Sequence, residues 1–154
     1  MPPMSRLRLA FPMLALAVCA APAVARAQTC SFSVGPTAVN FGNYDPSSPV
    51  PTDSTGTLSF SCKGGNPAVY VALSGGNGAL AFNPRQMALG ATDTLNYNLY
   101  LDAGRTQIWG DGTSYPQDGI DKKNTPYTIY ARIFENQWVA AGVYTDTIIV
   151  TLNY

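Results

Sequence analysis

The chain has 154 residues, of which 46% are hydrophobic and only 12% are charged, and it contains no histidine. The absence of histidine removes the commonest general base and metal ligand and every Ser-His or Cys-His nucleophile arrangement, so most familiar hydrolase classes are excluded. Few charges combined with 14 glycines and 9 tyrosines are typical of an extracellular β protein rather than of a helical or disordered chain.

The N-terminus has the pattern of a secretory signal peptide. Two arginines precede an apolar run over residues 9–21, and Ala25 and Ala27 supply small residues at the positions that determine cleavage. The run is too short to span a bilayer and no later segment reaches a spanning length, so no membrane-spanning element is expected. We therefore predict a signal peptide over residues 1–27 and one mature domain over residues 28–154.

Charge on the mature domain disfavours a nucleic-acid partner. Three of the nine basic residues leave with the signal peptide, so six basic residues face nine acidic ones and the net charge is −3. Nucleic-acid-binding domains are instead strongly basic.

Two cysteines remain in the mature domain, Cys30 and Cys62. An even pair in an exported chain predicts one disulfide. A metal or redox role is disfavoured because the two thiols are far apart in sequence, with no histidine and no CxxC spacing.

Apolar residues recur at period two wherever the pattern is clear, and no stretch of ten residues shows a helical stripe. The sequence predicts six clear strands and two shorter ones, separated by turn signals that include Asp111-Gly112 and Asp118-Gly119. Short strands with frequent turns and one cross-link indicate an all-β fold, an antiparallel β-sandwich. The alternating apolar sets are Phe32/Val34, Val39/Phe41, Leu58/Phe60/Cys62, Val69/Val71/Leu73, Leu95/Tyr97/Leu99/Leu101, Tyr127/Ile129/Ala131/Ile133 and Ile148/Val150/Leu152/Tyr154.

The end of the sequence keeps the strand pattern from Tyr144 to Tyr154, with Asp146 as its only charge. A long, apolar, nearly uncharged strand at a sheet edge is prone to aggregation and needs a partner. Either another part of the same chain pairs with it, or a second polypeptide supplies a strand by β-augmentation. The residues alone leave both alternatives open.

Five stretches of the sequence carry a shared pattern: Cys30–Val34, Val39–Asp45, Leu95–Asp102, Ile108–Gly112 and Gly142–Tyr154. In their order along the chain they resemble the spore coat protein U domain family, which includes subunits of archaic chaperone-usher pili. The resemblance implies an immunoglobulin-like sandwich that lacks its last strand, held first by a periplasmic chaperone and then by an N-terminal extension of the next subunit.

Carried over to this chain, the resemblance implies a strand-acceptor and chaperone-binding groove. Its lining is expected to be Phe32, Val34, Ile148, Val150, Leu152 and Tyr154. The expected protein is a non-enzymatic structural subunit without a cofactor. It is secreted to the periplasm, exported through an outer-membrane usher and assembled on the cell surface as part of a fimbrium that serves adhesion or biofilm formation.

Only Gln28 and Thr29 precede Cys30 in the predicted mature chain, whereas polymerising family members carry an extension of a dozen or more residues there. The chain is therefore expected to accept a strand without donating one by the usual route. This favours a terminal subunit, or a coat protein that shares the fold without polymerising.

Two alternative functions follow from other features. One is a self-contained secreted spore-coat or matrix protein whose last strand pairs within its own chain. The other is a carbohydrate-binding adhesin in which Trp109 stacks on a sugar ring while Asp111 and Tyr115 complete the contact. No metal site is expected, because Asp111, Asp118 and Asp121 lack the ligand spacing of a calcium loop.

Overall fold

The computed structural model describes residues 28–64, 68–77, 81–113, 115–116, 118–120 and 126–154, with the backbone alone described at 118–120. The predicted signal peptide over residues 1–27 lies outside the described residues. Every regular element within them is a β-strand, and every ladder is antiparallel, which confirms the all-β prediction.

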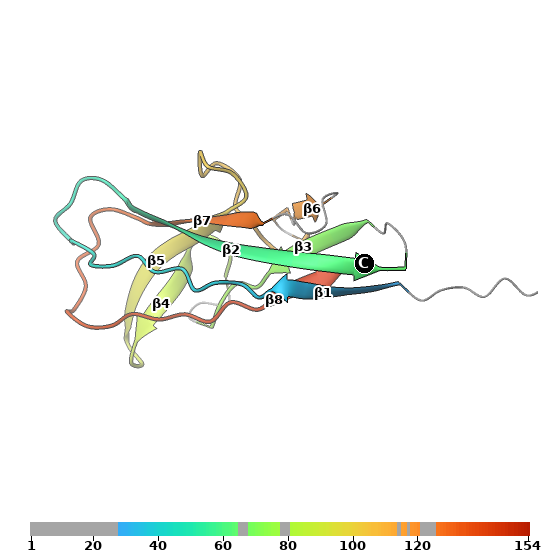
Figure 1. The fold of residues 1–154 in the computed structure, drawn as a ribbon. Coiled ribbons are helices and arrows are strands. Elements are labelled where there is room, and N and C mark those ends of the chain that lie inside the picture. Colours follow the sequence, from blue (N-terminus) through green and yellow to red (C-terminus); the bar gives the residue numbers. More distant parts are fainter. Residues whose placement is uncertain (1–27, 65–67, 78–80, 114, 117, 121–125) are drawn as a thin grey trace, which may run out of the picture.

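In the part of the chain that the structure describes, eight strands form two sheets (Figure 1). The five-stranded sheet has the order β1-β2-β7-β5-β4, and the three-stranded sheet has the order β6-β3-β8. The strands are β1 (Thr29–Val34), β2 (Thr52–Lys63), β3 (Val69–Leu73), β4 (Arg85–Leu89), β5 (Asp93–Tyr100), β6 (Asp118–Ile120), β7 (Tyr127–Ile133) and β8 (Val150–Asn153).

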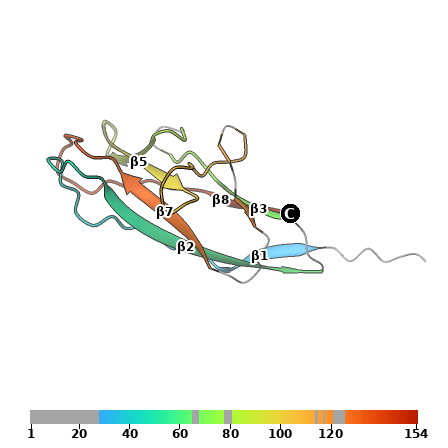
Figure 2. The ribbon, with the colours of Figure 1, turned by 90° about the horizontal axis from the view of Figure 1, so that it is seen from above.

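The two sheets pack as an immunoglobulin-like sandwich, with β3 and β8 facing the layer that contains β2 and β7 (Figure 2). Inward-facing apolar side chains of both sheets form one core, as the period-two patterns predict. The buried members are Leu58, Phe60, Val69, Val71, Leu73, Met87, Leu95, Tyr97, Leu99, Trp109, Ile129, Ala131 and Ile133.

The strands differ from the prediction in three places. β4 was not predicted, because its inward face begins with Arg85, which breaks the apolar alternation. β6 contains Asp118-Gly119, predicted as a turn; that prediction is wrong, because the backbone at Gly119 pairs with Tyr70 of β3. Val39 and Phe41 alternate as predicted, yet they lie in the connection between β1 and β2 and form no strand.

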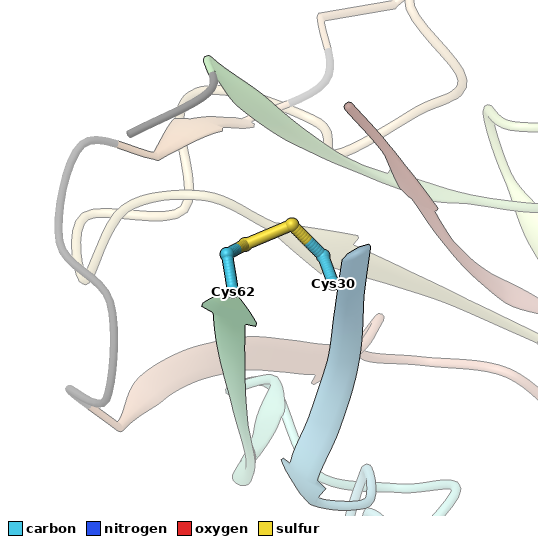
Figure 3. The surroundings of a disulfide bond; sticks show 2 residues. All are labelled: Cys30 and Cys62. Atoms are coloured by element: carbon cyan, nitrogen blue, oxygen red, sulfur yellow. A yellow bond between two sulfur atoms is a disulfide. The ribbon is translucent and has the colours of Figure 1, made fainter. Parts of the chain in front are cut away.

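The predicted disulfide is present. Cys30 and Cys62 lie directly opposite each other in the β1–β2 ladder, with their Cα atoms 4.1 Å apart (Figure 3). The bridge therefore clamps the first strand to the end of the second.

Replacing both Cys30 and Cys62 with alanine is expected to lower the free energy of unfolding by about 3.7 kcal/mol. The two cysteines are 32 positions apart, and opening a loop of that length restores about this much conformational entropy to the unfolded chain. Urea unfolding of the double variant, with wild type unfolded under dithiothreitol as the control, measures the loss. A decrease below about 1 kcal/mol would contradict the loop-closure argument.

Candidate functional site

Two adjoining cavities of about 510 and 640 Å³ open the sandwich along one side. Both are lined by Val39 and Phe41 from the connection between β1 and β2, by Tyr144 from the segment before β8, and by Met87 of β4. Since they share these side chains, the two cavities form one continuous feature, which we call the groove. Its floor consists of core residues, namely Leu73, Met87, Leu95, Tyr97, Leu99, Ile129 and Ile133.

The first wall of the groove is the segment 36–46, which lies against β2. The Thr37 backbone N–H donates to the Thr57 carbonyl at 2.8 Å, and the Ser54 hydroxyl donates to the Asn40 carbonyl at 2.6 Å. Gly56 allows this approach, because a Cβ there would come within 2.9 Å of a Val39 methyl carbon. This wall is thus anchored on its β2 side.

The second wall is the segment 139–150. From Tyr144 to Asn153 the residues alternate strictly between partly buried and exposed, which is the period of an extended strand. Only Val150–Asn153 belongs to a strand, β8. Before it, Thr145 forms an isolated antiparallel bridge with Ala88 of β4. The extended backbone of this wall therefore begins several residues before the part that pairs with another strand.

Figure 1 shows both walls, in cyan and orange-red, running lengthwise across the molecule with opposite chain directions. Within the described ranges no hydrogen bond joins residues 36–41 to residues 144–150. In the same ranges β1 has only β2 as a strand neighbour, and β8 has only β3. The two sheets are thus left unjoined along this side.

One end of the groove is closed by Tyr44. Its hydroxyl donates to the Phe134 carbonyl at 3.1 Å and accepts from the Gln137 backbone N–H at 2.8 Å. The first wall is thereby tied to the loop that follows β7.

Asp146 is the charged residue that lines the groove in the described part of the chain. Its Oδ1 accepts from the backbone N–H groups of Asn77 and Thr147, each at 2.7 Å, and its Oδ2 accepts from the Tyr97 hydroxyl at 2.7 Å. The carboxylate packs directly against Gly76, where φ is +84° and no Cβ would fit. These contacts hold the second wall in place.

A buried cation lies behind this carboxylate. Arg85 is 0% exposed, and it pairs with Tyr97 across the β4–β5 ladder. Burial lowers the pKa of Arg85 to about 10, which leaves it charged at neutral pH. Burial, together with the hydrogen bond to Asp146, raises the pKa of the Tyr97 hydroxyl, which therefore stays protonated and acts as a donor.

The six residues expected to line a groove are divided by the structure. Ile148 and Val150 line it. Phe32 and Leu152 lie outside it, partly buried against the core, and Val34 and Tyr154 are each 57% exposed. Sequence reasoning placed the groove between β1 and β8, whereas the cavities open between the irregular segments that follow β1 and precede β8.

Four of the lining residues that sequence reasoning missed belong to both cavities: Val39, Phe41, Met87 and Tyr144. The alternation of Val39 and Phe41 is visible in the sequence, and Tyr144 continues the period of Ile148 at an even spacing. Met87 carried no such signal, because β4 was not recognised.

The sugar-stacking platform that was considered at Trp109 as an alternative does not form. Trp109 is 1% exposed, and its indole N–H donates to the Val71 carbonyl at 2.8 Å, so the ring belongs to the core. Asp111 accepts the Thr113 backbone N–H at 2.9 Å in a turn, and the Tyr115 ring packs near Phe82. Without the tryptophan face, these residues do not form the expected glycan site.

Metal-binding geometry is not found in the described ranges, where no three His, Cys, Asp or Glu side chains gather to hold an ion. Of the acidic residues considered from the sequence, Asp121 lies outside the described residues, and only the backbone of Asp118 is described.

Among the described residues, no helix is long and apolar enough to cross a membrane.

Comparison with known proteins identifies relatives of the chain. Over 128 residues it is 34% identical to Protein U of Myxococcus xanthus, an alignment that covers 75% of this chain and 71% of Protein U. A solved structure, the CsuC-CsuE chaperone-tip adhesion subunit pre-assembly complex from the archaic chaperone-usher Csu pili of Acinetobacter baumannii, contains a similar fold. The TM-score is 0.52 at 20% identity, covering 83% of this chain and 40% of that chain.

The likeness to the Csu structure agrees with the immunoglobulin-like sandwich. The family model named Spore Coat Protein U domain matches residues 15–151, nearly the whole of the chain. The chain therefore belongs to the Spore Coat Protein U domain family.

Proposed function

We propose that this protein is a structural subunit of a cell-surface fibre, assembled when an extended segment of another polypeptide fills the groove. The observation that carries the proposal is the continuous apolar opening between residues 36–46 and 139–150, whose floor is the core itself. In β-augmentation an added strand pairs with an exposed sheet edge, and a groove that leaves the core open between two sheets offers such a place.

The free energy of filling the groove favours a long-lived complex with the added segment. A segment with four or five apolar side chains buried at roughly 1.5–3 kcal/mol each gains on the order of 10 kcal/mol before ordering costs. Backbone hydrogen bonds to the second wall add specificity of register, since its strand period extends beyond β8. No cofactor or energy source is needed for this step, and the proposed role is structural rather than catalytic.

The proposed partners are a periplasmic chaperone, an outer-membrane usher and a neighbouring subunit that donates the strand. Support comes from the family membership and from the likeness to the Csu tip subunit, which was solved with its chaperone. On this proposal the chain passes through the periplasm to the cell surface, where the fibre serves adhesion or biofilm formation.

Co-purification from the periplasm tests the proposal directly. The mature protein is expected to be recovered in a stoichiometric complex with a chaperone that occupies the groove. The proposal would be contradicted if the protein were recovered as a stable monomer that binds neither a chaperone nor an apolar strand peptide.

Replacing Ile148 with aspartate is expected to weaken partner binding by more than a hundredfold, because a carboxylate would be buried in the apolar seam without a partner. Ile148 lines the groove. Ile149, the next residue, is 63% exposed and serves as the matched control, so Ile149→Asp should bind normally. Affinity for the chaperone and thermal unfolding are measured together for both variants. Equal affinities in two folded variants would place the partner elsewhere.

A self-contained coat protein is the second candidate, favoured by the match to the Spore Coat Protein U domain model and by the 34% identity to Protein U of Myxococcus xanthus. It predicts that the chain covers its own groove. Hydrogen exchange on the isolated mature protein distinguishes the two at the backbone N–H groups of Asp146 and Ile148. The N–H groups of Thr145, Thr147 and Ile149 already donate within the chain, so protection at Asp146 and Ile148 without any partner is the result that favours the coat protein.

A further inference from the structure

Among the described residues that line the groove, Asp146 is the one that carries a charge. On the second wall the inward-facing residues are Tyr144, Asp146, Ile148 and Val150. A strand lying along this wall sets one of its own inward side chains beside each of them, because side chains alternate at the same period in both chains. One inward side chain of any such strand must therefore face the Asp146 carboxylate.

The hydrogen bonds of Asp146 leave room for one more donor. A carboxylate offers about four acceptor sites, two on each oxygen. Oδ1 already accepts from Asn77 and Thr147, whereas Oδ2 accepts from the Tyr97 hydroxyl. By this count one acceptor site remains on Oδ2. When a strand excludes water, an apolar neighbour would leave that charged acceptor unsatisfied at a considerable cost.

The required donor is uncharged. Arg85 is fully buried and pairs with Tyr97 across the β4–β5 ladder, and the Tyr97 hydroxyl in turn donates to Asp146, so a buried cation already lies in this part of the core. A second cation in the same water-excluded seam would lose its hydration and face Arg85. A short hydroxyl or amide side chain supplies the hydrogen bond without that penalty.

We infer, on the basis of the proposed function, that the strand filling the groove carries a neutral hydrogen-bond donor such as threonine, serine or asparagine at the position facing Asp146. Its neighbouring inward positions, which face Tyr144, Ile148 and Val150, carry apolar side chains. Asp146 then sets which partner strand fits and in which register it binds.

A valine-to-threonine scan tests this. Synthetic peptides of about nine residues carry valine at every inward position and serine or lysine at the outward ones. In each peptide one inward valine is replaced by threonine, which has the same shape and adds a hydroxyl. Binding of labelled peptides to the mature protein is measured by fluorescence polarisation.

Threonine is expected to weaken binding by about tenfold at most inward positions, because its hydroxyl is buried without a partner. At one position it should instead strengthen binding by about tenfold, through a hydrogen bond to a charged acceptor. In the Asp146→Asn variant that preference should shrink at least threefold, with the other positions unchanged. Thermal unfolding of this variant establishes that the second wall is still folded.

The outcomes separate the inference from the function on which it rests. If peptides bind but valine is preferred at every inward position, or the threonine preference is the same in Asp146→Asn, the role of Asp146 is overturned while strand binding stands. If no alternating peptide binds at any position, strand binding itself is overturned, and the inference with it.

Discussion

Replacing Arg85 with methionine is expected to lower the free energy of unfolding by about 4 kcal/mol. The guanidinium donates from Nε and Nη2 to the Ser74 carbonyl, from Nη2 to the Trp109 carbonyl and from Nη1 to the Asn98 side chain, at 2.6–3.0 Å. Methionine fills much of the volume but leaves these buried acceptors unsatisfied, at about 1–3 kcal/mol each with incomplete additivity.

A matched arginine provides the control. Arg132 makes a two-pronged ion pair with Asp53 at 2.7 and 2.9 Å, but it lies near the surface. Arg132→Met is therefore expected to cost no more than about 1 kcal/mol. Urea unfolding of both variants gives the two values. If Arg85→Met cost no more than Arg132→Met, the buried network would not hold the sheets together.

Replacing Trp109 with alanine is expected to destabilise the fold by about 4 kcal/mol, because removing a buried indole leaves a large cavity. The loss also breaks the hydrogen bond to the Val71 carbonyl of β3. Since the Trp109 backbone N–H donates to the Leu99 carbonyl of β5, the residue bridges the two sheets. Trp109→Phe should recover most of the packing but not the hydrogen bond.

The second tryptophan of the chain is the control for this prediction. Trp138 is 81% exposed, so Trp138→Ala should leave the free energy of unfolding within about 0.5 kcal/mol of wild type. Chemical denaturation followed by far-UV circular dichroism avoids relying on the fluorophore that is removed. A stable Trp109→Ala protein would show that the indole is not a core residue and would reopen a surface role for it.

Most strands were predictable from the sequence because their burial follows the simple period-two pattern. In β7, Ile129, Ala131 and Ile133 are buried and alternate with more exposed residues, as expected of a strand with one face in the core. β4 was not predicted because a charged residue, Arg85, occupies its inward face. An arginine predicts solvent exposure, and only three-dimensional neighbours that accept its hydrogen bonds make burial tolerable.

The lining of the groove was predicted only in part, because part of it depends on contacts between segments that are far apart in the sequence. Ile148 and Val150 were recognised because the apolar alternation of their own segment indicates an inward face, and this signal does not depend on which segment lies opposite. Val39 and Phe41 were recognised as alternating but not as the opposite wall, since their place depends on how the connection after β1 packs against Gly56 of β2. Trp109 was considered both as a core or rim residue and as an exposed sugar platform, because nothing in the neighbouring sequence signals which side of the strand end is buried.

By itself the sequence determined the all-β class, the antiparallel sandwich and the Cys30–Cys62 bridge. These features follow from local periodicity and from the pairing of two cysteines, which do not depend on distant contacts. The tertiary structure alone decided that the groove opens between residues 36–46 and 139–150, that Asp146 lines it, and that Arg85 and Trp109 are buried. The physical reason is that burial and cavity shape arise where segments far apart in the chain meet, and period-two alternation does not specify which segments these are.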